Sequence, residues 1–209
     1  MNFQDVLNIR QSTRRFTEEQ ISEEQLQMLL KAANQAPIGS AMYQDIHITV
    51  VQNQEILLHL CEAAWERFSS KEKVEEVAGD VAKKTPGMDE KKPNLFYHAP
   101  TVIFVSHRRQ TLQPGLEYAN VSTVINQMHL SAIDMGLGSC YMWGALESMR
   151  MIPELDHTDD LKLPEDFEPL MALAVGYPKD PLEKKVVLPE IGLNRIKKES
   201  FFAEKETFE

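Results

Sequence analysis

A chain of 209 residues is long enough to bury a full hydrophobic core, and 43% hydrophobic with 26% charged residues is typical of a globular protein. The formal net charge of −10 argues against nucleic acid as a partner, because phosphate backbones require clustered positive charge. It does not prevent a local basic pocket from holding a small anionic ligand. We expect a single domain over residues 1–209.

The apolar and cysteine patterns predict a cytoplasmic protein without a membrane partner. No stretch approaches the roughly 20 apolar residues of a membrane helix, and the first twelve residues lack the apolar core of a signal peptide. Cys61 and Cys140 are far apart and form no CxxC, so we expect no disulfide framework.

The N-terminal part predicts two helices. Residues 3–12 form a short amphipathic pattern, with Phe3, Val6 and Leu7 on one side. Residues 21–37 predict a longer helix, with Ser22 as the N-cap.

The middle of the chain alternates between strands and helices. The β-branched segments 45–52 and 99–107 predict strands, and the second reads as a buried central one. Residues 54–68 predict a helix. Residues 69–95 carry the densest charge and predict a solvated excursion.

The C-terminal half begins with the longest periodic segment. Residues 116–136 are apolar over much of the helix circumference, which favours a helix buried in the core or in a dimer interface. Strands are predicted at 139–143 and 169–178, with a helix and an irregular loop between them. Residues 179–209 lack core periodicity. This order predicts an α+β sandwich with a mixed sheet.

The glycine-rich stretch "GLGSCYMWGAL", residues 136–146, does not fit a dinucleotide-binding fingerprint. That fingerprint follows a strand and opens a helix, whereas this stretch follows a helix. We expect Gly136 to end the helix and Gly138 to begin the next strand. Gly144 has no such structural explanation.

No metal site and no catalytic side chain are predicted. The six histidines show no HxxxH, HxH or HExxH spacing, so they are interpreted as structural, with His107 and His129 in buried elements. Ser139 and Cys140 lack a GxSxG context or an identifiable base.

A basic cluster near the N-terminus stands out in this acidic chain. Arg10, Ser12, Arg14 and Arg15 lie within six residues. Guanidinium groups beside a hydroxyl can form a phosphate site, because arginine donates hydrogen bonds in a planar fork. The same residues could also form a solvated helix end, and the residues alone leave both readings open.

Five segments in order resemble the nitroreductase family of FMN-dependent flavoproteins. "IRQSTRRF" fits the family's R-x-S-x-R-x-F pattern, and "SEEQLQMLLKAANQAP" matches the helix that follows. "FYHAPTVIFV", "AIDMGLGSC" and "LMALAVGYP" are similar to later family segments. The resemblance implies a three-layer sandwich around a mixed, mostly antiparallel sheet, and a homodimer with two active sites at its interface.

The resemblance also implies a set of FMN-binding residues. Arg10 and Ser12 match positions that hold the phosphate and ribityl chain, and Arg14 matches a basic residue at the flavin pyrimidine edge. The backbone N–H of Trp143 would point at flavin N5. The full set is Arg10, Gln11, Ser12, Arg14, Pro37, Ile38, Gly39, Ser40, Met142, Trp143, Gly144, Arg195 and Lys197.

Pro37 to Ser40 would contact the flavin held by the other subunit. Residues 69–95 would form the substrate lid, and the tail 179–209 would wrap around the partner. The chain departs from the family after Ala-Pro: "IGSAMYQDIH" lacks the usual Asn and Gln-Pro-Trp, which Ser40 or Gln44 would have to replace.

The implied activity is hydride transfer from NAD(P)H through flavin N5 to an electron-poor acceptor, such as a nitroaromatic, quinone or enone. The scheme is ping-pong, and no side chain serves as a catalytic acid or base because the cofactor carries the chemistry. The alternative is a flavin-binding carrier or sensor without general reductase turnover.

Overall fold

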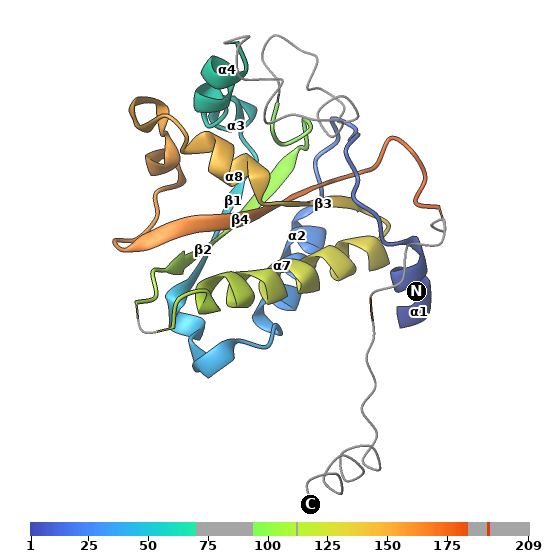
Figure 1. Cartoon of the computed structure of the whole chain (residues 1–209). Helices are drawn as coiled ribbons and strands as arrows, with labels where there is room; N and C mark the ends of the chain where they lie inside the picture. The colour runs from blue at the N-terminus through green and yellow to red at the C-terminus, as the bar shows by residue number, and fades with distance from the viewer. Residues whose placement is uncertain (70–93, 112, 184–191, 193–209) are drawn as a thin grey trace, which may run out of the picture.

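An antiparallel sheet lies at the centre of the fold, between two layers of helices (Figure 1). The computed structural model describes residues 1–69, 94–111, 113–183 and 192. In these ranges the sheet has the strand order β1-β2-β4-β3, and each neighbouring pair is antiparallel. The strands are β1 (Ile46–Val51), β2 (Thr101–Arg108), β3 (Gly138–Met142) and β4 (Phe167–Gly176).

Helices cover both faces of this sheet. One face carries α2 (Glu23–Asn34) and α7 (Leu116–Asp134), and the opposite face carries α3 (Gln54–His59), α4 (Glu62–Ser69) and α8 (Gly144–Met149) (Figure 1). The short helix α1 (Phe3–Ile9) lies near the end of α7. Single 3₁₀ turns are η1 (Gly39–Ala41), η2 (Tyr43–Asp45), η3 (Pro153–Leu155) and η4 (Thr158–Leu161).

Strand β2 shows why the layers stack in this way. Val102 and Phe104 belong to the core shared with α3, α4 and α8, whereas Ile103 and Val105 belong to the core shared with α2 and α7. Side chains alternate between the faces of a strand, so a strand that is covered on both faces must be apolar throughout. The predictions of a buried central strand and a three-layer sandwich are confirmed.

Helix α7 is buried against the sheet over most of its length. Its apolar residues Val121, Val124, Ile125, Met128 and Ala132 all belong to the core shared with α2. In the part of the chain that the structure describes, no helix is both long and apolar enough to span a membrane.

The helix termini follow the predicted local chemistry. Ser22 accepts from the Gln25 N–H and the Gln25 side chain accepts from the Ser22 N–H, which completes a capping box. Gly136 follows the C-cap of α7 with φ +76°, a left-handed conformation that glycine adopts without strain. In α1, Val6 is buried while Phe3 and Leu7 remain exposed.

Three predicted boundaries are corrected. The helix expected over 54–68 breaks at Leu60 and Cys61, and this turn allows Leu57 before it and Ala64 after it to be fully buried. The strand expected over 139–143 ends at Met142, because Trp143 turns into α8. The last strand extends back to Phe167, and its Pro169 is tolerated opposite a bulge between Val105 and Ser106.

Among the described residues, the parallel pairing expected in a mixed sheet is found in one isolated bridge. Ser12 pairs with Ser139 in parallel, beside β3. Most of the lid predicted over 69–95 and most of the tail predicted over 179–209 lie outside the described residues, so those two predictions stay untested.

Candidate functional site

The arginine-rich N-terminal arm, residues 10–18, lies along the outer edge of β3. The Thr13 N–H donates to the Ser139 carbonyl at 2.9 Å, and Ser12 pairs with Ser139 as the parallel bridge. Two segments that the sequence analysis marked separately, the arm and "GLGSC", are therefore one structural unit.

Arg10 is held from below by a buried histidine. Its Nη1 lies 3.3 Å from Nε2 of His129, whose Nδ1 lies 2.6 Å from the Ser139 hydroxyl. A guanidinium can only donate, so His129 accepts at Nε2 and donates at Nδ1 to Ser139. His129 and Ser139 are both buried, and they position Arg10 at the surface. The prediction of His129 as a satisfied structural histidine is confirmed.

Gly138 allows the arm to approach β3 closely. A Cβ at this position would lie 2.6 Å from Cγ2, 2.8 Å from Oγ1 and 2.9 Å from Cβ of Thr13. Real Cβ atoms do not tolerate such distances, so only glycine fits here without a shift of the arm. Gly138 begins β3 as predicted, and its contact with Thr13 supplies the reason.

Arg14 extends from the arm toward an aromatic ring. Its guanidinium carbon lies 5.9 Å from the centroid of the Tyr97 ring, within the range of a cation–π contact. Burial raises the pKa of the Tyr97 hydroxyl, the nearby Cys140 raises it further, and Arg14 opposes both through a hydrogen bond and its charge. At neutral pH the hydroxyl keeps its proton.

Cys140 lies in the same cluster. Burial raises the pKa of its thiol, and this outweighs the opposing effects of the Arg14 charge and a hydrogen bond with Ser12. The thiol is therefore protonated at neutral pH and is a poor nucleophile, in agreement with the sequence interpretation of Cys140 as a core residue.

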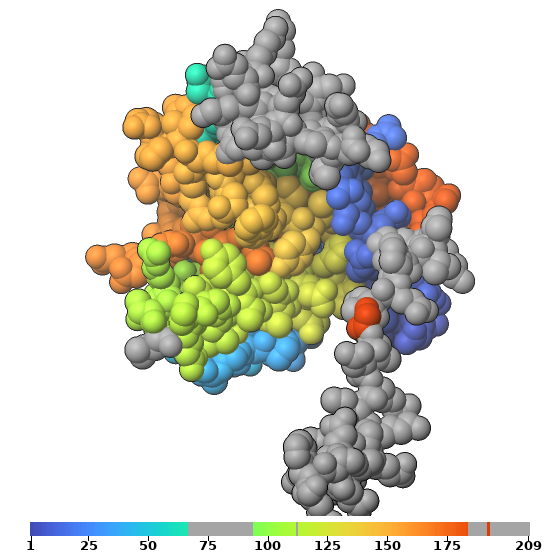
Figure 2. Space-filling view, viewed as in Figure 1, coloured from blue at the N-terminus to red at the C-terminus, as the bar shows by residue number. Residues whose placement is uncertain are grey.

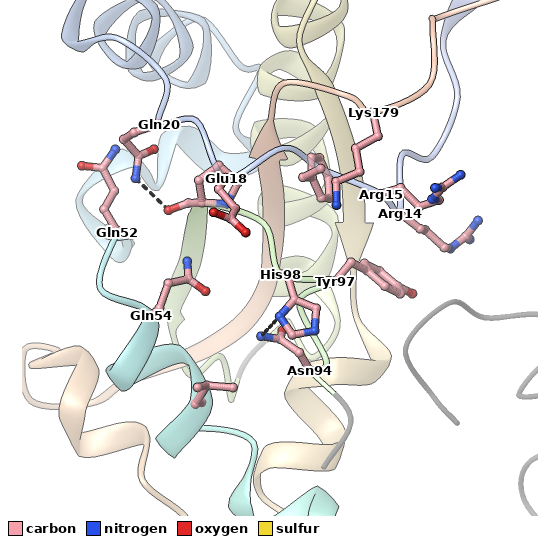
Figure 3. A pocket seen from close by; sticks show the side chains of 13 residues that line it. Arg14, Arg15, Glu18, Gln20, Gln52, Gln54, Asn94, Tyr97, His98 and Lys179 are labelled. Carbon is pink, nitrogen blue, oxygen red and sulfur yellow. Dashed lines mark hydrogen bonds between the residues drawn. The ribbon is translucent and has the colours of Figure 1, made fainter. Parts of the chain in front are cut away.

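A cavity of about 630 Å³ adjoins the arm. Figure 3 shows Arg14 and Tyr97 at one side of it and Gln20, Gln52 and Gln54 at the other. A second cavity of about 260 Å³ is lined by the arm itself, from Gln11 to Arg15, and by Asp180 and Pro181. The first volume is of the size that small-molecule sites usually have.

The segment after β4, residues 177–179, lies beside the arm and forms hydrogen bonds with it. The Thr17 N–H donates to the Tyr177 carbonyl at 2.9 Å, and the Lys179 N–H donates to the Arg15 carbonyl at 3.0 Å. Figure 2 shows the blue N-terminal arm against this orange segment on one face of the molecule. The arm is thus bonded on both sides, which gives it a defined course.

The junction of β3 and α8 presents an open backbone. Met142 is buried in the core, whereas Trp143 is 53% exposed. No atom lies within 4 Å of a Cβ built on Gly144, the first residue of α8. Ser139 directs its carbonyl outward to Thr13, so by strand alternation the backbone groups of Tyr141 also face away from β4.

The predicted residues 37–40 lie elsewhere in the same chain. The Gly39 N–H donates to Asn120 at 2.8 Å, and Thr123 donates to the Pro37 carbonyl at 3.0 Å, so the segment lies on the first half of α7. Arg10 contacts His129, nine residues beyond Asn120 or about 13 Å along the helix axis. Figure 1 shows η1 and α1 near opposite ends of α7.

Within one chain the fold places the arm against β3, and it leaves residues 37–40 apart from the arm. Trp143 and Gly144 follow the last residue of β3 in the chain. Arg195 and Lys197 lie outside the described residues.

Sequence reasoning missed three residues that shape the site. The Tyr97 ring contacts the Arg14 guanidinium. His129, which is hydrogen-bonded to Ser139, contacts the Arg10 guanidinium. Tyr97 precedes β2, His129 lies in α7 and Ser139 lies in β3, so no motif spacing links these residues to the arm.

Comparison with known proteins assigns this arrangement to a family. Residues 7–177 match the model of the nitroreductase family, so the chain belongs to that family. It is 26% identical over 194 residues to an FMN reductase [NAD(P)H] of Bacillus subtilis (strain 168), an alignment that covers 88% of this chain and 68% of the relative.

Two solved structures have the same fold. The nitroreductase with bound FMN from Bacteroides fragilis superposes with a TM-score of 0.74 at 23% identity, over 94% of this chain and 100% of that one. The FMN-dependent nitroreductase from Clostridium difficile R20291 has a TM-score of 0.68 at 25% identity, over 92% of this chain and 99% of that one.

Proposed function

We propose that this protein is an FMN-dependent NAD(P)H oxidoreductase. The observation that carries the proposal is the pairing of the arm with β3, which gathers Arg10, Ser12 and Arg14 around the segment that leads to Gly144. Family membership and the FMN reductase [NAD(P)H] of B. subtilis support the choice of cofactor and electron donor.

The residues present fit FMN. Arg10, fixed by His129, and the exposed Ser12 hydroxyl would hold the phosphate and ribityl chain, with Gln11 beside them. Gly144 leaves open space where a side chain would block a flat ring. Bound FMN would supply a hydride acceptor at N5 and pass the hydride on to an electron-poor acceptor.

Arg14 would stabilise the negative charge that reduction places on the pyrimidine edge of the flavin. A fixed cation at the position where charge develops is worth most in a site that is partly shielded from water. The contact with Tyr97 and the bond to its hydroxyl hold the guanidinium in place. No side chain of the arm would act as a catalytic acid or base.

The β3–α8 junction would meet the reactive edge of the ring. The Trp143 N–H comes directly after Met142, the last residue of β3, and from this position it would donate to flavin N5. Met142 would contribute backbone only, because its side chain is buried in the core.

A homodimer would complete the site. Pro37, Ile38, Gly39 and Ser40 lie too far along α7 to reach the arm of their own chain, which supports a contact with the flavin of a second subunit. Arg195 and Lys197 would complete the phosphate site.

The electron donor NAD(P)H and the electron acceptor would bind in turn at the same open position beside the flavin. Binding in turn defines a ping-pong scheme, with nitroaromatics, quinones or enones as acceptors.

The proposal is tested by anaerobic mixing. The purified protein is expected to be yellow, to bleach when NADH or NADPH is added without oxygen, and to recover its colour with a quinone. A matched sample without nucleotide serves as the control for photoreduction.

The outcomes separate the two candidate functions. A yellow protein that stays yellow with both nucleotides would exclude the reductase and leave the carrier or sensor. A colourless protein whose addition to FMN leaves the flavin fluorescence unquenched would contradict any flavin function.

Arg10→Ala tests the phosphate contact. A hydrogen-bonded charge contact of this kind contributes about 1.5–3 kcal/mol, so FMN affinity at low salt is expected to fall about 10- to 100-fold. Because salt screens the contact in the unaltered protein, the difference between the two proteins should narrow as ionic strength rises. Fluorescence titration measures both effects.

Riboflavin, which lacks the phosphate, provides the control ligand, and Arg109→Ala provides the control variant because Arg109 is 77% exposed and pairs with Glu168. Neither riboflavin binding by Arg10→Ala nor FMN binding by Arg109→Ala should change. An equal loss of FMN and riboflavin affinity would place Arg10 away from the phosphate.

A further inference from the structure

Two histidines and a glutamate meet on the helical face opposite α7. His59 is the last residue of α3, Glu62 is the first residue of α4, and His157 is the N-cap of η4. One nitrogen of each histidine and one oxygen of Glu62 all lie within 4.8 Å of one another.

The distances approach those of a metal site. His157 Nε2 lies 2.9 Å from Glu62 Oε2, and His59 Nε2 lies 3.9 Å from the same oxygen. Ligand atoms around a tetrahedral ion with bonds of 2.0–2.1 Å lie about 3.3 Å apart. The two nitrogen–oxygen separations bracket this value and the ligand atoms all lie within 4.8 Å of one another, so side-chain rotations would bring the three atoms into position.

Asp160 orients one of the histidines. Its Oδ2 lies 2.7 Å from His59 Nδ1. The carboxylate accepts a hydrogen bond from the Nδ1–H, which leaves the lone pair of His59 at Nε2, on the side of Glu62. A carboxylate that bonds the other nitrogen of a metal-binding histidine is the usual support of such a ligand.

The two imidazoles lie against each other, with ring centroids 3.7 Å apart and planes inclined by 19°. This stacking keeps the two imidazole rings adjacent to each other beside Glu62. The side chains of His59 and Glu62 are 44% and 39% exposed, so an ion could enter from solvent.

We propose that His59, Glu62 and His157 bind a divalent transition-metal ion, with Asp160 as the positioning residue for His59. Two imidazole nitrogens and one carboxylate oxygen suit Zn²⁺ and its neighbours, whereas Mg²⁺ and Ca²⁺ prefer oxygen alone. Three protein ligands leave one tetrahedral position for water or another small ligand. This proposal is independent of the flavin, because none of these residues lines either cavity beside the arm.

The ion would join two parts of the fold. Glu62 and His157 are separated by 95 residues, and the site ties the α3–α4 corner to the loop that precedes β4 (Figure 1). The sequence predicts no metal site because the histidines show none of the spacings HxxxH, HxH or HExxH, which place two histidines on one segment. Here each histidine instead has an acid three residues later, in "HLCE" and "HTDD", and folding brings these two pairs together.

The test uses the full-length protein with its flavin, treated with a chelator and titrated with Zn²⁺ by calorimetry. We expect one ion per protomer, no binding of Mg²⁺, and a rise in Tm of about 5 °C or more when free Zn²⁺ is 100-fold above Kd. His157→Ala and the nearly isosteric Glu62→Gln should each abolish this site. Asp160→Asn should weaken it about 10- to 100-fold.

His47→Ala is the matched control, because His47 is a partly buried histidine on β1 that contacts Phe167 and is not a member of the cluster. It should bind Zn²⁺ as the unaltered protein does. Unchanged flavin content and Tm without metal verify that the variants fold. Failure of the unaltered protein to bind Zn²⁺, or binding that persists in both His157→Ala and Glu62→Gln, would overturn the proposal and leave two hydrogen-bonded histidine–carboxylate pairs.

Discussion

Arg14→Ala is expected to slow reduction of the flavin by NAD(P)H about 100-fold and to lower the amount of FMN retained on purification. Loss of one fixed group that stabilises developing charge typically costs about 10²- to 10³-fold in rate. The flavin potential should become more negative, because the reduced form loses its cation. Stopped-flow reduction and a potentiometric titration measure the two effects.

Two other residues provide the controls for Arg14. Arg109 is also exposed but lies outside the arm and pairs with Glu168 at 3.7 Å, so Arg109→Ala should change neither rate nor potential. Tyr97→Phe keeps the ring under the guanidinium and removes only the hydroxyl, and its effect should be smaller than that of Arg14→Ala. A normal reduction rate and full FMN content in Arg14→Ala would show that Arg14 does not face the flavin.

Gly138→Ala is expected to destabilise the protein and to weaken FMN binding at the same time. The new methyl group would overlap three side-chain atoms of Thr13, and one of them is the Cβ, which cannot rotate away. Overpacking of this kind costs about 1–3 kcal/mol. The arm must move to relieve it, and Arg10 and Ser12 move with the arm. Thermal unfolding and fluorescence titration measure the two losses.

Two further variants distinguish this cause from others. Thr13→Gly combined with Gly138→Ala removes the overlap and should recover stability beyond the sum of the single changes. Gly144→Ala meets no atom within 4 Å, so it should leave stability unchanged and reduce only FMN affinity. If Gly138→Ala melts and binds FMN normally, the close contact between the arm and β3 does not position the site.

The predictable parts of the fold were those with a local cause. Ser22 and Gln25 satisfy each other's backbone groups within one turn, and Gly136 supplies the left-handed residue that ends α7. Neither feature depends on contacts with distant residues, so the local amino-acid sequence alone predicts both features. The apolar run of β2 likewise reports burial on both faces.

The errors arose where burial by distant segments decides the conformation. The helix break at Leu60 and Cys61 contains no glycine or proline that would predict it. The break is favoured because the residues on both sides of the turn pack into one core. Trp143 suits a strand by propensity, yet the chain leaves β3 there to begin α8.

The candidate site was predictable only in part. The resemblance pointed to the arm, and the structure placed the arm on β3. Tyr97, His129 and Ser139 could not be linked to the arginines from spacing, because each contact joins segments that are distant in the chain. The same reason hid the cluster of His59, Glu62 and His157.

The amino-acid sequence by itself determined the Ser22 cap, the glycine that ends α7, most of the helices and strands, the sandwich class and the family, because these depend on local hydrogen bonding, periodicity and short motifs. Only the tertiary structure decided which polar groups meet. Residues 37–40 lie apart from Arg10, whereas His59 and His157 lie in contact. Such contacts follow from the packing of whole elements, which no short stretch of sequence encodes.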